Sequence, residues 1–482
     1  MTTECNQPSF TFHAHFSREV IGRFDGGTIT SDGGALLLRE VEQRTGILRQ
    51  FAACFTDHRD PDLIEHHVQE LVAQRVYGLA LGYEDLNDHD DLRHDPLLAV
   101  LAGKPDPTGQ DRRRDRDRGK ALAGKSTLNR LELTPADATA DSRYKKIVVD
   151  RWKAERFFVE VFLQAQATPP ERIVIDLDPT DSRLHGHQQG RFFHGYYGHY
   201  CYLPLYLFCG EFLLCARLRP SCLDAAAGSV KILARIVEQI RARWPKVQIV
   251  IRGDSGFCRE ELMAWCEAHG VDYLLGLAKT ERLIAEITGE LEQARQCFEE
   301  TRQASRVFKD FTFQTRESWS RARRVVAKAE HLEKGSNPRF VVTSIPPETM
   351  DARSLYEDEY CARGEMENRI KEQQLYLFAD RCSAATLRAN QQRLWFSSVA
   401  YVLMQALRRL GLEGTHLEKA QCHTIREKLL KIGAQIKVTV RKVWVALAEG
   451  YPYARVFAQV MEKLRALVVG SVPSTRAPPL RR

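Results

Sequence analysis

Hydrophobic periodicity divides the chain into a helical beginning, a middle that contains strands, and a helical end. Between Pro61 and about Leu81, apolar residues recur at the three- and four-residue spacing that predicts a helix. A second helix is expected over about 34–45, after a Ser-Asp-Gly-Gly sequence that suits a helix start. From about residue 357 the same spacing predicts helices nearly to the end of the chain.

The pattern changes to that of strands at about residue 171. The β-branched run 172–178 is followed by Pro179, which predicts a buried strand that ends there. Further strands are expected at 199–208, 212–219, 247–254 and 272–277, with helices over 229–244 and 259–269. A hairpin followed by strand–helix units predicts an α/β sheet with helices on both faces.

Two aspartates stand where predicted strands end. Asp178 ends the first strand and Asp254 the fourth, so both carboxylates would lie at one sheet edge if these strands are neighbours. Such acids repel each other unless a cation lies between them, and hard oxygen ligands suit Mg²⁺ or Mn²⁺. Asp176 lies on the same sheet face as Asp178 and is the alternative first acid. Taken alone, either aspartate is also explained as a cap of the following turn.

A third acid lies on a predicted helix late in the chain. Tyr360, Arg363, Glu367 and Lys371 follow one another at three- and four-residue spacing, which places them on one helix face. The alternative is an exposed ladder of charges, which stabilises a helix by only a few tenths of a kcal/mol per pair (about 0.2–0.5).

These motifs together resemble the DDE transposases of bacterial insertion sequences, most closely the group numbered thirteen-eighty. The shared features are an Asp followed by x-Thr, an Asp with Gly two residues later, and a helix with Tyr-x2-Arg-x3-Glu. Three longer segments also match, TSDGGALLL, HGHQQGRFFHGYYGHY and RGDSGF. The resemblance extends from about residue 20 to 440, and it rests on the order and spacing of motifs that are weak singly.

The resemblance implies an RNase H-like α/β core, with a mixed sheet, helices on both faces, a β-rich insertion and mainly helical N- and C-terminal regions. It implies two Mg²⁺ or Mn²⁺ ions and the catalytic, metal-binding residues Asp178, Asp254 and Glu367. Tyr360 and Arg363 would contact DNA. The family often has a lysine seven residues after the glutamate, where this chain has Gln374, and Lys371 is the alternative for that role.

The implied protein is a DNA transposase that binds element ends, cleaves DNA and joins the 3′-OH ends to target DNA, as a homodimer. The expected domains are 1–140 for DNA binding, 141–405 for catalysis and 406–482 as a basic helical region. Asp254 and Glu367 are 113 residues apart, so an inserted subdomain is expected at about 280–350. In its basic part, Trp319, Arg321, Arg323 and Arg324 are expected to hold displaced DNA, whereas core packing is the equal alternative for Trp319.

The composition bears on the cellular location of the protein and shows that charge is unevenly distributed along the chain. Residues 421–482 carry a net charge of +9, which indicates a polyanionic partner or a solvated surface, and the whole chain carries +7. The twelve cysteines form no CxxC pair, no signal sequence is evident, and no membrane span is expected, so a cytoplasmic protein is predicted. The family resemblance implies that the cytoplasm is bacterial. The competing hypotheses are an inactive DNA-binding protein of the same fold and, last, a two-carboxylate hydrolase.

Overall fold

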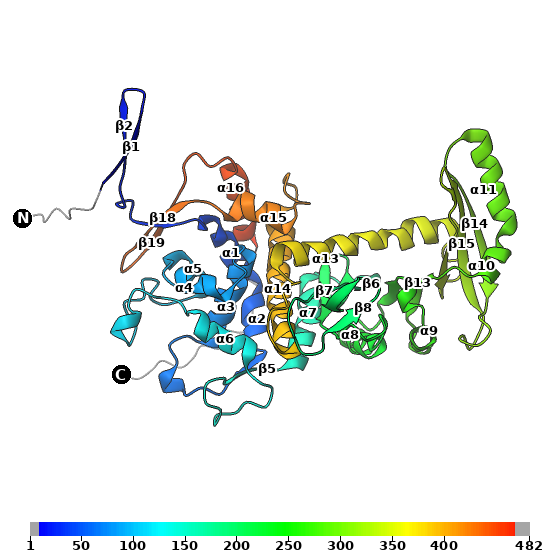
Figure 1. The fold of residues 1–482 in the computed structure, drawn as a ribbon, viewed down its shortest axis with the longest axis horizontal. Helices are drawn as coiled ribbons and strands as arrows, with labels where there is room; N and C mark the ends of the chain where they lie inside the picture. Colours follow the sequence, from blue (N-terminus) through cyan, green and yellow to red (C-terminus); the bar gives the residue numbers. More distant parts are fainter. Residues whose placement is uncertain (1–8, 468–482) are drawn as a thin grey trace, which may run out of the picture. The chain divides into compact units, whose positions relative to one another are not determined.

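The computed structural model describes residues 9–467, which fall into two compact units (Figure 1). One unit joins the chain up to Val148 with the chain from Val399 onward, and the other is Val149–Ser398. The two terminal regions that the sequence separates therefore belong to one unit.

A nine-stranded mixed sheet forms the centre of the unit 149–398, in the order β11-β10-β6-β12-β13-β17-β15-β14, with β16 beside β15. Its strands are β6 (Arg172–Pro179), β10 (Leu205–Cys209), β11 (Phe212–Arg217), β12 (Gln248–Gly253), β13 (Asp272–Leu277), β14 (Ser305–Phe313), β15 (Arg323–Leu332), β16 (Gly335–Ser336) and β17 (Arg339–Thr343). Strands β6, β12 and β13 are parallel. Strand β10 is antiparallel to both β6 and β11, so β11 runs in the direction of β6.

The two faces of this sheet are buried by different helices. Ile173, Ile175 and Leu177 of β6 point into a core that also contains residues of α7, α8 and α9. The other face packs against a π-helical segment, Leu355–Tyr360. The helices of this unit are α7 (Arg151–Ala165), α8 (Ser229–Arg243), α9 (Glu260–Ala268), α10 (Glu281–Glu286), α11 (Thr288–Thr301), α12 (Ala352–Ser354), α13 (Gly364–Leu377) and the first part of α14 (Leu387–Leu407). The predicted class, a mixed α/β sheet with helices on both faces, is confirmed.

The β-rich insertion is an extension of the main sheet. Strand β17 pairs antiparallel with β13, β15 pairs with β17, and β14 closes the edge. Helix α11 packs along β14 and β15 (Figure 1). The insertion therefore shares its hydrophobic core with the sheet that carries the two aspartates.

Pro204 breaks the expected strand 199–208 in two. A proline has no N–H for the strand ladder, and the chain leaves the small sheet at β9 (His199–Tyr202) and enters the main sheet at β10. The small sheet also contains β7 (Ser182–Arg183) and β8 (Phe192–His194), on either side of β9. The predicted hairpin turn at 209–211 is confirmed, with Gly210 at a positive φ of 57°.

The other unit is mainly helical. Its helices are α1 (Leu36–Thr45), α2 (Ile47–Ala52), α3 (Val68–Ala80), α4 (His89–Leu92), α5 (Pro96–Ala102), α6 (Lys125–Leu133), α15 (Cys422–Ile425), α16 (Ala454–Ala466) and the end of α14. Its strands are β1 (Phe10–His15), β2 (Arg18–Gly22), β3 (Thr28–Thr30), β4 (Phe55–Asp57), β5 (Ile147–Val149), β18 (Ala434–Val438) and β19 (Val443–Leu447).

A hairpin interrupts the C-terminal region that was expected to be helical. Residues 434–447 alternate between apolar and polar side chains, and β18 pairs with both β19 and β3. The chain near residue 30 and the chain near residue 435 are thus built into one sheet. The last residues of the basic tail, 468–482, lie outside the described part of the chain.

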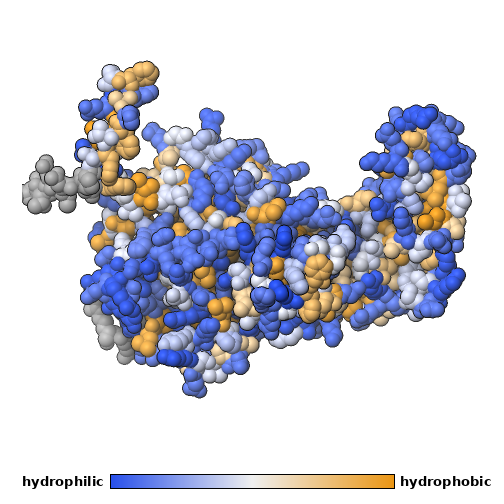
Figure 2. All heavy atoms as spheres, viewed as in Figure 1, coloured by the Kyte–Doolittle hydropathy of each residue, from blue (hydrophilic) through white to orange (hydrophobic). Residues whose placement is uncertain are grey.

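Hydrophobic side chains gather on the β1–β2 hairpin, as Figure 2 shows. Phe10, Phe12 and Ile21 of this hairpin are about half exposed. Within residues 9–467, no helix is both long and apolar enough to cross a membrane.

Candidate active site

The two aspartates that end predicted strands lie side by side. Strands β6 and β12 are parallel neighbours, and their register pairs Leu177 with Gly253. The next residues are Asp178 and Asp254, so both carboxylates leave the sheet at its C-terminal edge. The condition set by the sequence analysis, that the first and fourth strands are neighbours, is confirmed.

Glu367 approaches this edge from helix α13, with Arg363 as the link. Arg363 lies 3.2 Å from Asp178 (Nη1 to Oδ1) and 3.2 Å from Glu367 (Nη2 to Oε1). The second pair is one helical turn apart, the spacing that brings side chains to one helix face. The structure therefore brings the first and third candidate acids together through one guanidinium group.

Burial and repulsion make Asp178 hard to ionise. Its pKa is raised to about 7, mainly because the carboxyl is buried, while Arg363 opposes the rise and the charges of Asp254 and Glu367 add to it. A buried acid beside like charges is stabilised as the anion by a nearby cation. The electrostatics of this edge therefore favour a bound cation, and Arg363 supplies one positive charge there.

Asp176 is engaged elsewhere. Its two carboxylate oxygens accept hydrogen bonds from Arg252, at 2.5 Å from Nε and 2.8 Å from Nη2, and both side chains are buried. Arg252 also donates to the carbonyl of Glu359, which ties β12 to the π-helical segment. This ion pair occupies both oxygens of Asp176, and it favours Asp178 as the first acid.

Tyr360 packs over the turn that carries Asp254. Its hydroxyl oxygen lies 2.5 Å from the position that a Cβ would take at Gly276, so only glycine leaves room for it. Burial raises the pKa of Tyr360, Arg363 lowers it, and the charge of Asp254 raises it again. Tyr360 ends the π-helical segment 355–360, and a 3₁₀ turn over 361–363 leads into α13. Such local helix distortions often accompany functional sites.

Lys371 and Gln374 lie further along α13. Lys371 is exposed one turn after Glu367 and has no ion pair among the described residues. Gln374 donates through Nε2 to the carbonyl of Asp181 at 2.9 Å. The glutamine at the family's usual lysine position therefore holds the loop that follows β6.

The sequence analysis missed Tyr197 and Asp181. His199, the first residue of β9, pairs with Asp181 between β6 and β7, Nε2 to Oδ2 at 2.8 Å. The pKa of Tyr197 is raised to about 12 by burial and then by the charges of Asp181 and Asp178. Both tyrosine and histidine belong to the HGHQQGRFFHGYYGHY segment, whose match to the family was the available signal.

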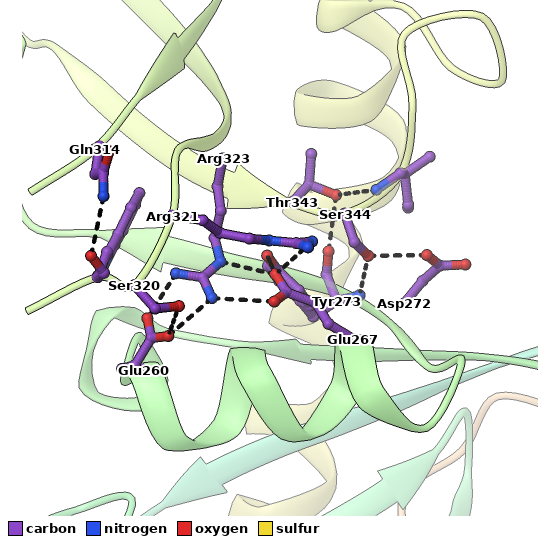
Figure 3. Close-up of polar contacts among 12 residues, drawn as sticks. Glu260, Glu267, Asp272, Tyr273, Gln314, Ser320, Arg321, Arg323, Thr343 and Ser344 are labelled. Atoms are coloured by element: carbon purple, nitrogen blue, oxygen red, sulfur yellow. Dashed lines mark hydrogen bonds and ion pairs between the residues drawn. The ribbon is translucent and has the colours of Figure 1, made fainter.

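Two insertion residues expected to touch DNA, Trp319 and Arg323, are buried within the fold. Trp319 is buried at 6% exposure and packs edge-on against Phe313, which favours the core alternative. Figure 3 shows Arg323 between Glu260 and Glu267, at 2.6 and 2.7 Å, and the Arg323 side chain is 2% exposed.

Arg324 and Arg321 differ in how many bonds their side chains make within the protein. Arg324 binds Asp310 and the carbonyls of Ile345 and Met350. Arg321 pairs with Glu267 at 3.2 Å, yet its side chain is 62% exposed. Arg321 keeps an open side chain, whereas Arg323 and Arg324 bond within the sheet, to α9 and to the chain after β17.

The three acids have the right chemistry for a divalent cation, but their carboxylates do not converge on one point. Three carboxylates at one edge are the hard oxygen donors that Mg²⁺ and Mn²⁺ prefer. Within residues 9–467, however, no three His, Cys, Asp or Glu side chains converge closely enough to hold a metal ion as they stand. Arg363 lies between two of the acids, so a metal ion there requires Arg363 to turn away.

Comparison with known proteins identifies the family. The family described as transposase DDE domain group 1 matches residues 12–469. Among solved structures, the chain is similar to a piggyBac transposase in a synaptic complex with hairpin DNA, with 10% identity, a TM-score of 0.38, and coverage of 93% of this chain and 87% of that one. No curated protein matches. The family match spans nearly the whole chain, and the protein therefore belongs to the DDE transposase family, group 1.

Proposed function

We propose that the protein is an active transposase that binds the ends of a mobile element, cleaves DNA there and joins the 3′-OH ends to target DNA. The observation that carries this proposal is the edge where Asp178 and Asp254 follow neighbouring parallel strands and Glu367 reaches them through Arg363. The strand order β11-β10-β6-β12-β13 supports an RNase H-like core, with the insertion joined beyond β13.

The three acids would hold two Mg²⁺ or Mn²⁺ ions. Such ions activate a water or 3′-hydroxyl nucleophile and stabilise the leaving oxygen of an in-line displacement. Arg363 holds Asp178 and Glu367 together, and it becomes available to a DNA phosphate when a metal charge replaces its own. Tyr360 fixes the turn of Asp254, and exposed Lys371 reaches DNA from the same helix.

The unit formed by both terminal regions is proposed to recognise the element end. Residues 1–140 were expected to bind DNA and 406–482 to form a separate basic region, but β3 pairs with β18, so we assign end recognition to the unit as a whole. Joining two element ends requires two active sites, and we propose a homodimer. We place the protein in the bacterial cytoplasm, with an insertion sequence of the group numbered thirteen-eighty.

The test is cleavage of a linear duplex that ends in the inverted repeat flanking the gene, with Mg²⁺ or Mn²⁺. Asp178→Asn, Asp254→Asn and Glu367→Gln should each abolish cleavage and retain DNA binding. Glu365→Gln is the matched control, because Glu365 is an exposed acid two residues away on the same helix. Cleavage that persists in Glu367→Gln, or is lost in Glu365→Gln, would contradict the assignment of the third acid.

The alternative is a DNA-binding protein of the same fold without activity. The ion pairs of Arg363 favour it to some extent, because they occupy two of the three acids. Specific binding of the repeat duplex without cleavage in either metal would establish this alternative.

A further inference from the structure

A basic groove lies in the unit 149–398, away from the residues discussed above. It is a cavity of about 570 Å³ where α7 and α8 begin, where β11 ends and where α14 begins. Its lining contains six basic residues and no acid: Arg151, Arg217, Arg219, Lys231, Arg235 and Arg388.

A neighbouring cavity does not share this positive charge. A neighbouring cavity of the same volume, between the middles of α7 and α8, balances three arginines with three glutamates. Beside the basic groove, Glu155 is shared by three arginines, bonding Arg151 at 3.0 Å and Arg217 and lying 3.8 Å from Arg235. One carboxylate for three guanidinium groups leaves the groove strongly positive.

One wall of the groove presents its charge in a fixed place. Arg235 lies over the ring of Trp152 at 4.0 Å, and Trp152 is half exposed. Lys231, one turn earlier on α8, is exposed and has no ion pair among the described residues. Lys231 is therefore the basic side chain of this wall that is open to an incoming anion.

The groove opens at the same sheet edge as the acids. Arg217 is paired with Leu205, and Leu205 is paired with Pro179, so the end of β11 is level with the end of β6. Two strand spacings separate β6 from β11, about 10 Å.

A fixed loop joins the groove to the turn of Asp254. Buried Arg219 donates to the carbonyls of Leu203 and Ala225, at 3.1 and 2.9 Å, which holds the chain between β11 and α8. The side chain of Ala225 lies 3.3 Å from the Cβ position of Gly256, so a larger residue at 256 would require a shift. The N–H of Gly256 donates to Oδ1 of Asp254 at 2.8 Å, and Asp254 caps the turn that follows it. The basic groove and the proposed catalytic acids thus lie in one unit at one sheet edge, with the groove on the face covered by α7 and α8 and Asp178 on the other face.

We propose that this groove binds the backbone of duplex DNA next to the phosphate that is cleaved. The inference rests on the proposed function. The occupant is DNA because a string of phosphates matches a groove with six basic residues and no acid, at the sheet edge where the proposed catalytic acids also lie. The ends of β11 and β6 are about 10 Å apart, and DNA advances about 3.4 Å per nucleotide, so we expect the contacted phosphate within about three nucleotides of the cleaved bond.

The experiment measures how salt affects the binding of full-length protein to the repeat duplex. Lys231→Ala should lower the slope of log K against log salt by about one unit, the value for one lost phosphate contact. Lys246→Ala is the matched control. Lys246 is also exposed, but it precedes β12 and so lies at the opposite edge of the sheet.

A second measurement locates the contact. Neutral methylphosphonates replace single phosphates of the duplex in turn, and one or two positions within about three nucleotides of the cleaved bond should weaken binding by the wild-type protein. At those positions Lys231→Ala should show no additional loss, because protein and DNA changes remove the same interaction.

The outcomes separate this inference from the proposed function. An unchanged slope for Lys231→Ala, a change equal to that of Lys246→Ala, or additive losses at every phosphate would overturn the groove assignment while cleavage by the wild type still stands. If the wild type binds but does not cleave, the catalytic proposal fails, and a lowered slope for Lys231→Ala would still support the groove.

Discussion

A methyl group added at Gly276 would press on the turn that holds Asp254. The Cβ of an alanine there would lie 2.5 Å from Tyr360 Oη, 2.9 Å from the nitrogen of Ser255 and 3.2 Å from the carbonyl carbon of Asp254. Non-bonded atoms prefer about 3.5–4.0 Å, so something must move by roughly half an ångström or more. The tyrosine can swing aside, but the backbone of 254–255 can move only by displacing the Asp254 carboxylate.

Two magnitudes follow for Gly276→Ala. Overpacking costs about 1–3 kcal/mol of unfolding free energy. A catalytic group displaced by about 1 Å lowers the rate roughly 10²-fold. We therefore expect a moderate fall in melting temperature, a cleavage rate about two orders of magnitude lower at saturating DNA, and unchanged DNA affinity.

Gly364→Ala provides the control for this prediction. Gly364 is also close to the site, at the start of α13, but no heavy atom lies within 4 Å of its Cβ position. Alanine also favours a helix over glycine by up to about 1 kcal/mol. Gly364→Ala should thus cleave normally and melt no lower than the wild type. Equal rates for the two variants would refute the argument that close packing at Gly276 positions Asp254.

Three further outcomes test the assignments. Trp319→Ala should lower the unfolding free energy by about 3–5 kcal/mol, measured by denaturant titration, and leave nicking and second-strand cutting equal to each other at low temperature; a selective loss of the second cut would restore a DNA role. Asp176→Asn should lower the unfolding free energy by about 3–5 kcal/mol, because Arg252 stays buried without its charged partner. Asp178→Asn should melt no lower than the wild type. The reverse result would make Asp176 the catalytic acid and Asp178 the structural one. Burial, and then the charge of Arg75, lowers the pKa of His89 from 6.5 to about 3, so the unfolded state binds its proton first as pH falls. Stability should therefore decline below about pH 6.5 by up to about 1.4 kcal/mol per unit; a His89→Gln variant with the same slope in pH-dependent melting would contradict this.

The sequence predicted the placement of the acids because strand ends carry a local signal. A β-branched run that stops at Pro179, and a second run that stops after Gly253, fix where both carboxylates leave the sheet. The choice between Asp176 and Asp178 could not be made in this way. It depends on Arg252, which is 76 residues from Asp176 and becomes its neighbour only when β6 and β12 pair.

Pairing across the chain also explains the errors at the C-terminal end. The segment 434–447 has the alternation of strands, but it lies among segments with helical spacing, and the whole region was expected to be helical. A two-stranded hairpin is only marginally stable alone, so the local sequence does not show what would stabilise strands there. Strand β3, about 400 residues earlier, supplies the third strand. A deletion from residue 421 would therefore remove part of the sheet and core of this unit, and it would not test the +9 charge as a DNA-binding tail.

The net charge of a sequence segment does not predict the charge that its side chains expose on the folded surface. Residues 302–339 carry a net charge of +6. Arg323 and Arg324 nevertheless form ion pairs and hydrogen bonds with acids and carbonyls of the same unit, because a buried guanidinium group needs partners. The basic groove shows the reverse. Its six basic residues come from positions 151 to 388 and form no run in the sequence. They come together where β11 ends and α7, α8 and α14 begin, at the sheet edge where the proposed reaction needs a DNA backbone. Lys231 is thus a better test of DNA binding than the bonded arginines Arg323 and Arg324 of the insertion.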